Sequence, residues 1–76
     1  MFVVYGREDC KYCRKAKKAL ELVGEKFRYI PLEDLDEVRE ELRVKGFETI
    51  PAIFYQDEVL GGYDQLHEWI TEKYLS

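Results

Sequence analysis

Cys10-Lys11-Tyr12-Cys13 is the stretch that decides the fold, because it lies between a short apolar run, Phe2-Val3-Val4-Tyr5, and a segment with helical periodicity. This placement predicts a strand that gives way to a helix at the first cysteine. The N–H groups and the positive dipole end of a helix N-terminus stabilise an anion, and the thiolate is the form of cysteine that attacks a disulfide. We therefore interpret Cys10 as the attacking thiol and Cys13, nearly one helical turn further on, as the shielded thiol that resolves the product.

Two cysteines separated by two residues also occur in zinc sites, in structural disulfides and as buried apolar side chains. Zinc in proteins usually has four ligands, and the only other histidine or cysteine in the chain is His67. A disulfide that closes so short a loop constrains the unfolded chain little. Inert burial stays open, because free cysteine often packs as a small hydrophobic side chain. The redox interpretation is the leading one, and we expect no bound metal.

The size of the chain predicts a single domain that spans residues 1–76, of which 46% are hydrophobic. No apolar stretch follows a basic start, and none approaches the roughly 20 residues that a membrane span requires. We therefore expect a soluble cytoplasmic protein with no membrane partner. Thiols are kept reduced in the cytoplasm, which favours a catalytic over a structural role for the cysteine pair.

The formal net charge is -4, but basic and acidic residues are distributed unevenly along the chain. Residues 7–28 include eight basic and four acidic side chains, whereas residues 32–76 include four basic and twelve acidic ones. The dithiol thus lies in the positive half, which favours a thiolate and an anionic substrate, although the same lysines also fit the solvated face of an amphipathic helix. Nucleic acid is not an expected partner, because the whole chain is acidic and Tyr12 is the only aromatic residue in the basic cluster from Lys11 to Lys18.

Apolar periodicity and turn residues predict four strands and three helices. The predicted strands run from Phe2 to Tyr5, Phe27 to Leu32, Pro51 to Tyr55 and Val59 to Leu60, and the predicted helices begin near Lys11, at Asp34 and near Asp64. We expect Gly24 to end the first helix and Gly46 the second. The order βαβαββα implies an α/β fold with a mixed sheet, in which the first two strands are parallel and the last two form an antiparallel hairpin.

Three separated signatures occur in the chain: the Cys10 to Cys13 dithiol, Thr49-Ile50-Pro51 before the third predicted strand, and Gly61-Gly62-Tyr63-Asp64 after the fourth. In this order, and over essentially the whole chain, they resemble the glutaredoxins and look most like the small phage-type members. The resemblance implies a minimal thioredoxin-like fold in which the peptide bond before Pro51 is cis. The residues alone leave that bond open, because a proline that opens a strand is more often trans.

The resemblance also implies a glutathione site around the attacking sulfur. It assigns Cys10 as the nucleophile and Cys13 as the resolving thiol. It also implies that the backbone of Ile50 faces an extended substrate and pairs with it as a neighbouring strand would. The start of the last helix offers N–H groups to the γ-glutamyl carboxylate of glutathione. The residues so assigned to glutathione binding are Lys11, Tyr12, Thr49, Ile50, Pro51, Gly62, Tyr63 and Asp64. The rings of Tyr12 and Tyr63 also fit ordinary partial burial, and Asp64 also fits a helix N-cap.

Two positions depart from the family pattern. Lys11 stands where glutaredoxins usually carry proline, so the chain gains a positive charge beside the thiolate and loses a fixed backbone angle. Gln65 stands where many members carry an aspartate that meets the glutathione ammonium. Either Asp64 substitutes for that contact, or the contact is weaker in this chain.

The leading hypothesis is a glutathione-dependent thiol-disulfide oxidoreductase that reduces protein disulfides and glutathione mixed disulfides, with glutathione as co-substrate and no tightly bound cofactor. The resemblance suggests ribonucleotide reductase as one protein substrate, and we expect the chain to act as a monomer. The first alternative is a thioredoxin-like electron donor that receives its electrons from a flavoprotein reductase. The second is an iron–sulfur cluster binding module, in which two chains hold the cluster through Cys10 and glutathione.

Overall fold

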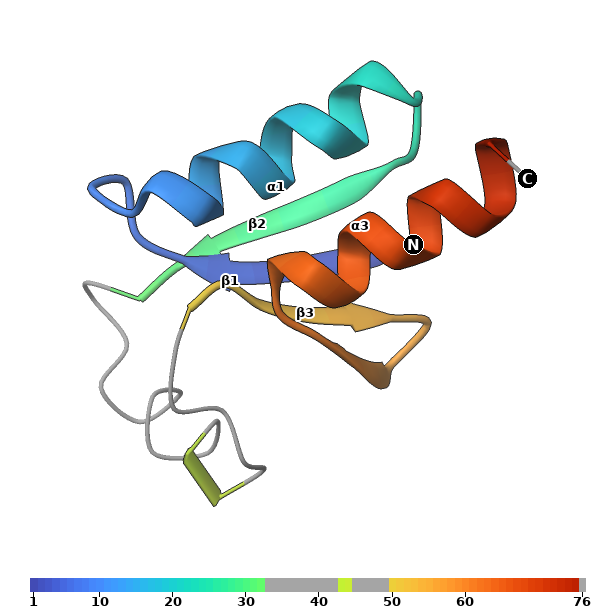
Figure 1. The fold of residues 1–76 in the computed structure, drawn as a ribbon. Coiled ribbons are helices and arrows are strands. Elements are labelled where there is room, and N and C mark those ends of the chain that lie inside the picture. The colour runs from blue at the N-terminus through green and yellow to red at the C-terminus, as the bar shows by residue number, and fades with distance from the viewer. Residues whose placement is uncertain (33–42, 45–49, 76) are drawn as a thin grey trace.

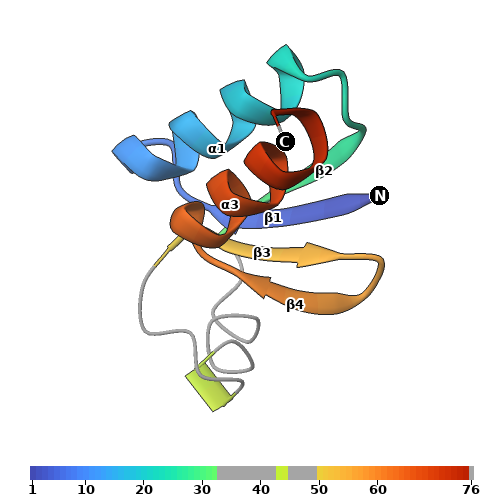
Figure 2. The same cartoon turned by 45° about the vertical axis from the view of Figure 1, so that its right-hand side comes forward.

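The computed structural model describes residues 1–32, 43–44 and 50–75. They form a four-stranded sheet with two helices, both on the same face of the sheet (Figures 1 and 2). The strands are β1 (Phe2–Gly6), β2 (Phe27–Pro31), β3 (Ala52–Tyr55) and β4 (Glu58–Gly61), and the helices are α1 (Lys11–Leu22) and α3 (Tyr63–Tyr74). The helix predicted between Asp34 and Gly46 lies outside the described residues except for positions 43–44. Neither α1 nor α3, the helices of the described part, has the length and apolar character needed to cross a membrane.

The strands lie in the order β2-β1-β3-β4. β1 and β2 run parallel and are joined through α1, whereas β3 is antiparallel to both of its neighbours, β1 and β4. The mixed α/β sheet that the order of the elements predicts is therefore confirmed. This order places β1, the strand that leads into the dithiol, in the interior of the sheet (Figure 2).

Helix α1 ends at the glycine that the sequence predicts. Gly24 has a φ of +76°, a left-handed conformation that glycine adopts without steric cost. Its N–H donates a hydrogen bond to the carbonyl oxygen of Glu21, and the N–H of Glu25 donates to that of Leu20. These two bonds form a Schellman motif, which satisfies carbonyl groups that the last helical turn leaves without partners. The motif ends α1 and turns the chain toward β2.

The main hydrophobic core lies between the sheet and the two helices. Its fully buried side chains are Phe2, Val4, Ala16, Leu20, Ile53 and Leu66. Residues of β1 alternate between the two faces of the sheet, so Val3 and Tyr5 lie on the opposite face from this core. There they pack against a second buried cluster, formed by Leu32, Ala52 and Phe54. Packing on both faces fixes β1 in place, and with it the start of the dithiol segment.

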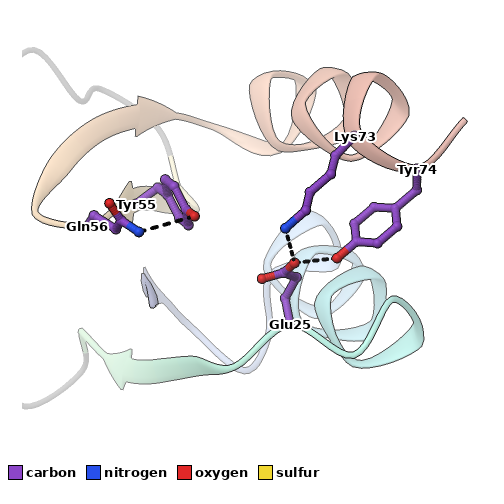
Figure 3. A network of polar contacts seen from close by, with 5 residues as sticks. All are labelled: Glu25, Tyr55, Gln56, Lys73 and Tyr74. Carbon is purple, nitrogen blue, oxygen red and sulfur yellow. Dashed lines mark hydrogen bonds and ion pairs between the residues drawn. The ribbon is translucent and has the colours of Figure 1, made fainter. Parts of the chain in front are cut away.

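The turn between β3 and β4 consists of Gln56 and Asp57, and the predicted antiparallel hairpin is confirmed. Both residues have positive φ angles, 50° and 68°, as in a type I′ turn, whose twist matches that of the flanking strands. The side-chain amide of Gln56 donates a hydrogen bond to the hydroxyl of Tyr55 at 3.3 Å (Figure 3). The hairpin brings Gly61 back beside Ile53, so α3 begins near the start of β3.

Helix α3 begins slightly earlier than the sequence predicts, because its N-cap is Gly62 and not Asp64. The side chain of Gln65 explains the difference, since its Oε1 accepts a hydrogen bond from the N–H of Gly62 at 2.8 Å. A glutamine three residues after the N-cap commonly makes this contact as one half of a capping box. Asp64 lies exposed in the first turn, where its negative charge is favourable near the positive end of the helix dipole.

A polar cluster joins the last turn of α3 to the loop after α1 (Figure 3). The carboxylate of Glu25 accepts a hydrogen bond from the Lys73 ammonium at 2.9 Å and another from the Tyr74 hydroxyl. The Lys73 ammonium also lies over the ring of Trp69, 4.9 Å from its centroid. The hydrogen bond from Tyr74, followed by that from Lys73, lowers the pKa of Glu25 below its ordinary value of 4.5.

We expect Glu25→Gln to lower the thermal unfolding midpoint at neutral pH, because the amide carries no charge to pair with Lys73. A lowered carboxyl pKa contributes stability above the unfolded value of 4.5, and this contribution is lost as the pH falls from 4.5 through the folded-state pKa. The difference between variant and wild type, followed by circular dichroism, should therefore disappear in that acid range. Glu21→Gln, at an exposed position in the last turn of α1, is the control. An equal loss of stability in both variants would contradict the prediction.

Candidate active site

Cys10 lies at the N-terminus of α1, as the sequence predicts. It is the N-cap residue, its backbone is extended, and its Sγ accepts a hydrogen bond from the N–H of Cys13 at 3.2 Å. The sulfur thus takes the place that a serine or aspartate oxygen has at other helix N-termini, where backbone N–H groups and the dipole favour negative charge. On its other side the Cys10 thiol faces the carbonyl oxygen of Ile50, at 3.9 Å.

Cys13 is fully buried, whereas Cys10 is only partly buried, and both cysteines are free thiols in this structure. Burial, followed by the contact with the Cys10 side chain, raises the pKa of the Cys13 thiol from 9.0 to about 12. A hydrogen bond from the backbone of Arg7 acts in the opposite direction and lowers this pKa. The two sulfurs therefore differ in the way that the sequence predicts, with Cys10 accessible and Cys13 sheltered.

The peptide bond between Ile50 and Pro51 is cis, as the resemblance to glutaredoxins implies. Pro51 is buried directly before β3, and Ile50 is partly buried. Because the Ile50 carbonyl faces the Cys10 thiol, the sulfur lies between the N-terminus of α1 and the Ile50–Pro51 segment. Thr49, which the sequence assigns to the same segment, lies outside the described residues.

The start of α3 lies beside the Ile50–Pro51 segment. The position that a Cβ would take on Gly62 is 3.6 Å from the carbonyl oxygen of Pro51. The ring of Tyr12, from the first turn of α1, and the ring of Tyr63, the first residue of α3, have centroids 5.8 Å apart. Two helix N-termini therefore lie at the same end of the sheet, with an aromatic pair between them.

The structure thus brings together most of the residues predicted for the site. They are Cys10, Tyr12, Cys13, Ile50, Pro51, Gly62 and Tyr63. Lys11 and Asp64 lie exposed in the first turns of α1 and α3, at the edge of this group. Tyr12 is 51% exposed, and the Lys15 ammonium lies 5.2 Å from the centroid of its ring. An anion that approaches Cys10 would therefore meet an exposed aromatic surface and positive charges.

Two residues that lie beside the site, Gly6 and Tyr29, are not identified from the sequence. Gly6 ends β1, and the position that a Cβ would take there is 2.7 Å from the Sγ of Cys13 and 3.0 Å from the hydroxyl oxygen of Tyr29. A larger residue at this position would collide with the sheltered thiol. The available signal is a glycine at the end of a buried strand, which often marks a close approach of other groups. Tyr29 gives no such signal, because tyrosine is common in strands for packing reasons alone.

We expect iodoacetamide to label Cys10 and to leave Cys13 unmodified in the folded, reduced protein. The reason is that Cys13 is fully buried and its thiol has a pKa of about 12, so very little thiolate is present near neutral pH. Peptide mass spectrometry after brief alkylation measures the labelling of each cysteine. The same reaction in denaturant is the control and should label both, whereas equal labelling in the folded state would show that the two thiols do not differ.

Comparison with known proteins agrees with this geometry. A family model described as glutaredoxin matches residues 2–60. Glutaredoxin 3 of Escherichia coli K12 is 35% identical over 65 residues, which cover 84% of this chain and 78% of that protein. The structure of the glutaredoxin-like NrdH-redoxin from Escherichia coli has a TM-score of 0.77 and 30% identity, covering 88% of this chain and 91% of that one. A buckwheat glutaredoxin in complex with glutathione has a TM-score of 0.83 and 26% identity, covering 97% of this chain and 71% of that one. The chain therefore has a thioredoxin-like fold and belongs to the glutaredoxin family of thiol-disulfide oxidoreductases.

Proposed function

We propose that this chain is a cytoplasmic dithiol glutaredoxin that uses glutathione to reduce protein disulfides and glutathione mixed disulfides. The observation that carries the proposal is the position of the Cys10 sulfur, between the N-terminus of α1 and the carbonyl group of Ile50. A thiolate at this position is stabilised by backbone N–H groups and remains open to a disulfide on its exposed side. Cys13, immediately behind it, is sheltered from solvent and from external disulfides.

The reaction follows from these positions. The Cys10 thiolate attacks one sulfur of the substrate disulfide, the other sulfur leaves as a thiolate with the bonding electron pair, and a mixed disulfide forms at Cys10. Cys13 then attacks the Cys10 sulfur, releases the second substrate thiol and closes the Cys10–Cys13 disulfide. When the bound group is glutathione, a second glutathione can release it instead. Two glutathione molecules restore the dithiol and leave as glutathione disulfide.

The surroundings of Cys10 offer the groups that glutathione requires. The backbone of Ile50 is available to pair with an extended peptide, and the start of α3 offers N–H groups to a carboxylate. The N–H of Gly62 is already bonded to Gln65, so the N–H groups of Tyr63 and Asp64 are the donors proposed for the γ-glutamyl carboxylate. A family member from buckwheat has been solved with glutathione, which supports the same ligand here.

A thioredoxin-like electron donor is the second candidate function. One observation favours it: the structure is similar to that of NrdH-redoxin, a glutaredoxin-like protein with a thioredoxin-like activity profile. The two functions differ in the source of electrons, which is glutathione in one and a flavoprotein reductase in the other. A coupled assay with a small mixed disulfide distinguishes the two functions. The assay is run once with glutathione and glutathione reductase, and once with thioredoxin reductase. Turnover with thioredoxin reductase alone would overturn the glutathione proposal. Ribonucleotide reductase stays a predicted protein substrate.

We expect Cys10→Ser to abolish activity toward every disulfide, because it removes the attacking sulfur. We expect Cys13→Ser to retain the removal of glutathione from a mixed disulfide, since a second glutathione can release the product without Cys13. The same variant should lose most of its activity toward a protein disulfide. Both activities are measured by NADPH consumption coupled to glutathione reductase. If Cys13→Ser lost both equally, the roles assigned to the two cysteines would be wrong.

We expect Gln65→Asp to bind glutathione more tightly than Gln65→Asn does. Both variants shorten the side chain that contacts Gly62, but only the aspartate adds a negative charge for the glutathione ammonium. An exposed ion pair contributes up to about 1 kcal/mol, which corresponds to a KM for glutathione roughly fivefold lower. The measurement is the glutathione dependence of the coupled assay at fixed mixed disulfide. Equal KM values in the two variants would show that the ammonium group does not lie near position 65.

A further inference from the structure

Tyr29 lies on β2, and its hydroxyl and the sheltered thiol of α1 both lie close to Gly6 at the end of β1. The position of a Cβ on this glycine would be 2.7 Å from the Sγ of Cys13 and 3.0 Å from the Tyr29 hydroxyl oxygen. Both atoms therefore occupy the space that a side chain at position 6 would need. The absence of a side chain on Gly6 lets the hydroxyl and the sulfur approach the same spot.

The sheet register and helix α1 together hold Tyr29 in this position. Tyr29 pairs with Val4 of β1, two residues before Gly6, and its ring packs against the main core. The ammonium of Lys17 lies 4.3 Å from the centroid of the ring. Lys17 follows Cys13 by four residues, so the two lie on the same side of α1. The ring is thus held between β2 and α1, with its hydroxyl near the sulfur of Cys13.

Cys13 must lose a proton before it can attack, and its position makes that loss difficult. The side chain is fully buried, and burial is the main reason that its pKa is raised to about 12. The backbone of Arg7 donates a hydrogen bond that favours the thiolate, but this single donor leaves the pKa high. A second donor at the sulfur would stabilise the charge further, and a tyrosine hydroxyl is such a donor.

We propose that Tyr29 is a positioning residue for the resolving step, in which its hydroxyl donates a hydrogen bond to the sulfur of Cys13 as that sulfur becomes a thiolate. The proposal rests on the roles proposed above for the two cysteines. In this step the Cys13 proton passes to water, and the Cys13 sulfur forms a bond to the Cys10 sulfur. The bond between Cys10 and the bound thiol breaks, and the thiol leaves as a thiolate with the electron pair. Tyr29 keeps its own proton throughout.

Within the described part of the chain, other charged or titratable groups lie near Tyr29 and Cys13. They are Cys10, Lys17 and the ion pair of Arg7 with Asp9, whose Nε and Oδ1 atoms are 3.4 Å apart. Cys10 and Asp9 raise the pKa of Cys13 through their charge. Tyr29→Phe changes none of these groups and keeps the ring beneath Lys17. The substitution therefore isolates the effect of the hydroxyl.

The test uses the reduced protein and an aromatic disulfide, 5,5′-dithiobis(2-nitrobenzoate), in a stopped-flow mixing experiment. Attack by Cys10 releases one coloured thiolate in a first phase that depends on reagent concentration. Attack by Cys13 releases a second coloured thiolate in a later phase whose rate does not depend on reagent concentration. The Cys13→Ser variant should lack this second phase and so identifies it. For Tyr29→Phe we expect an unchanged first phase and a second phase about tenfold slower at neutral pH, because a hydrogen bond to a charged group commonly contributes that much. The pH profile of the second phase should also move to higher pH.

Tyr55→Phe is the matched control. It removes the same atom from a ring that also packs against the main core, but the Tyr55 hydroxyl contacts Gln56 at the hairpin turn. If the two phenylalanine variants had the same second-phase rate and the same pH profile, the role of Tyr29 would be overturned while the cysteine roles stood. If the wild-type protein showed no second phase, the cysteine roles would be overturned, and the role of Tyr29 with them.

Discussion

The hydrogen bond from the N–H of Cys13 to the sulfur of Cys10 connects the folding of this protein to its chemistry. For the helix, the bond satisfies one of the donors that the first turn of α1 leaves without partners. For the sulfur, the same donor stabilises negative charge. The residue that starts the helix is therefore also one of the two thiols of the site.

The difference between the two cysteines depends on how tightly the end of β1 packs against α1. β1 is packed on both faces, which holds Gly6 rigidly at its end. Cys13 fits against this glycine with no space for a Cβ between them, and it is sheltered there while Cys10 stays at the rim. The same fold thus provides one partly exposed sulfur and one that is shielded from solvent.

Features that local patterns encode could be predicted from the sequence. The spacing of Cys13, Ala16 and Leu20 gives the buried side of α1, and Gly24 ends the helix where expected. The N-cap of α3 was misplaced because Asp64 is a favourable capping residue, and the competing contact from Gln65 to Gly62 depends on a side-chain conformation. The proximity of Tyr29 to Cys13 could not be found, since it arises only when β1, β2 and α1 pack together. Thr49 and most of the predicted second helix lie outside the described residues.

The contact between Gln65 and Gly62 gives the start of α3 an internal hydrogen-bond acceptor. The side-chain amide is tethered three residues away, so it competes for the Gly62 N–H at a high effective concentration. A small inorganic anion that gains only this one donor has little advantage over the internal acceptor. The first N–H of α3 is therefore satisfied within the chain itself, and an acceptor that approaches this helix start meets the N–H groups that follow Gly62.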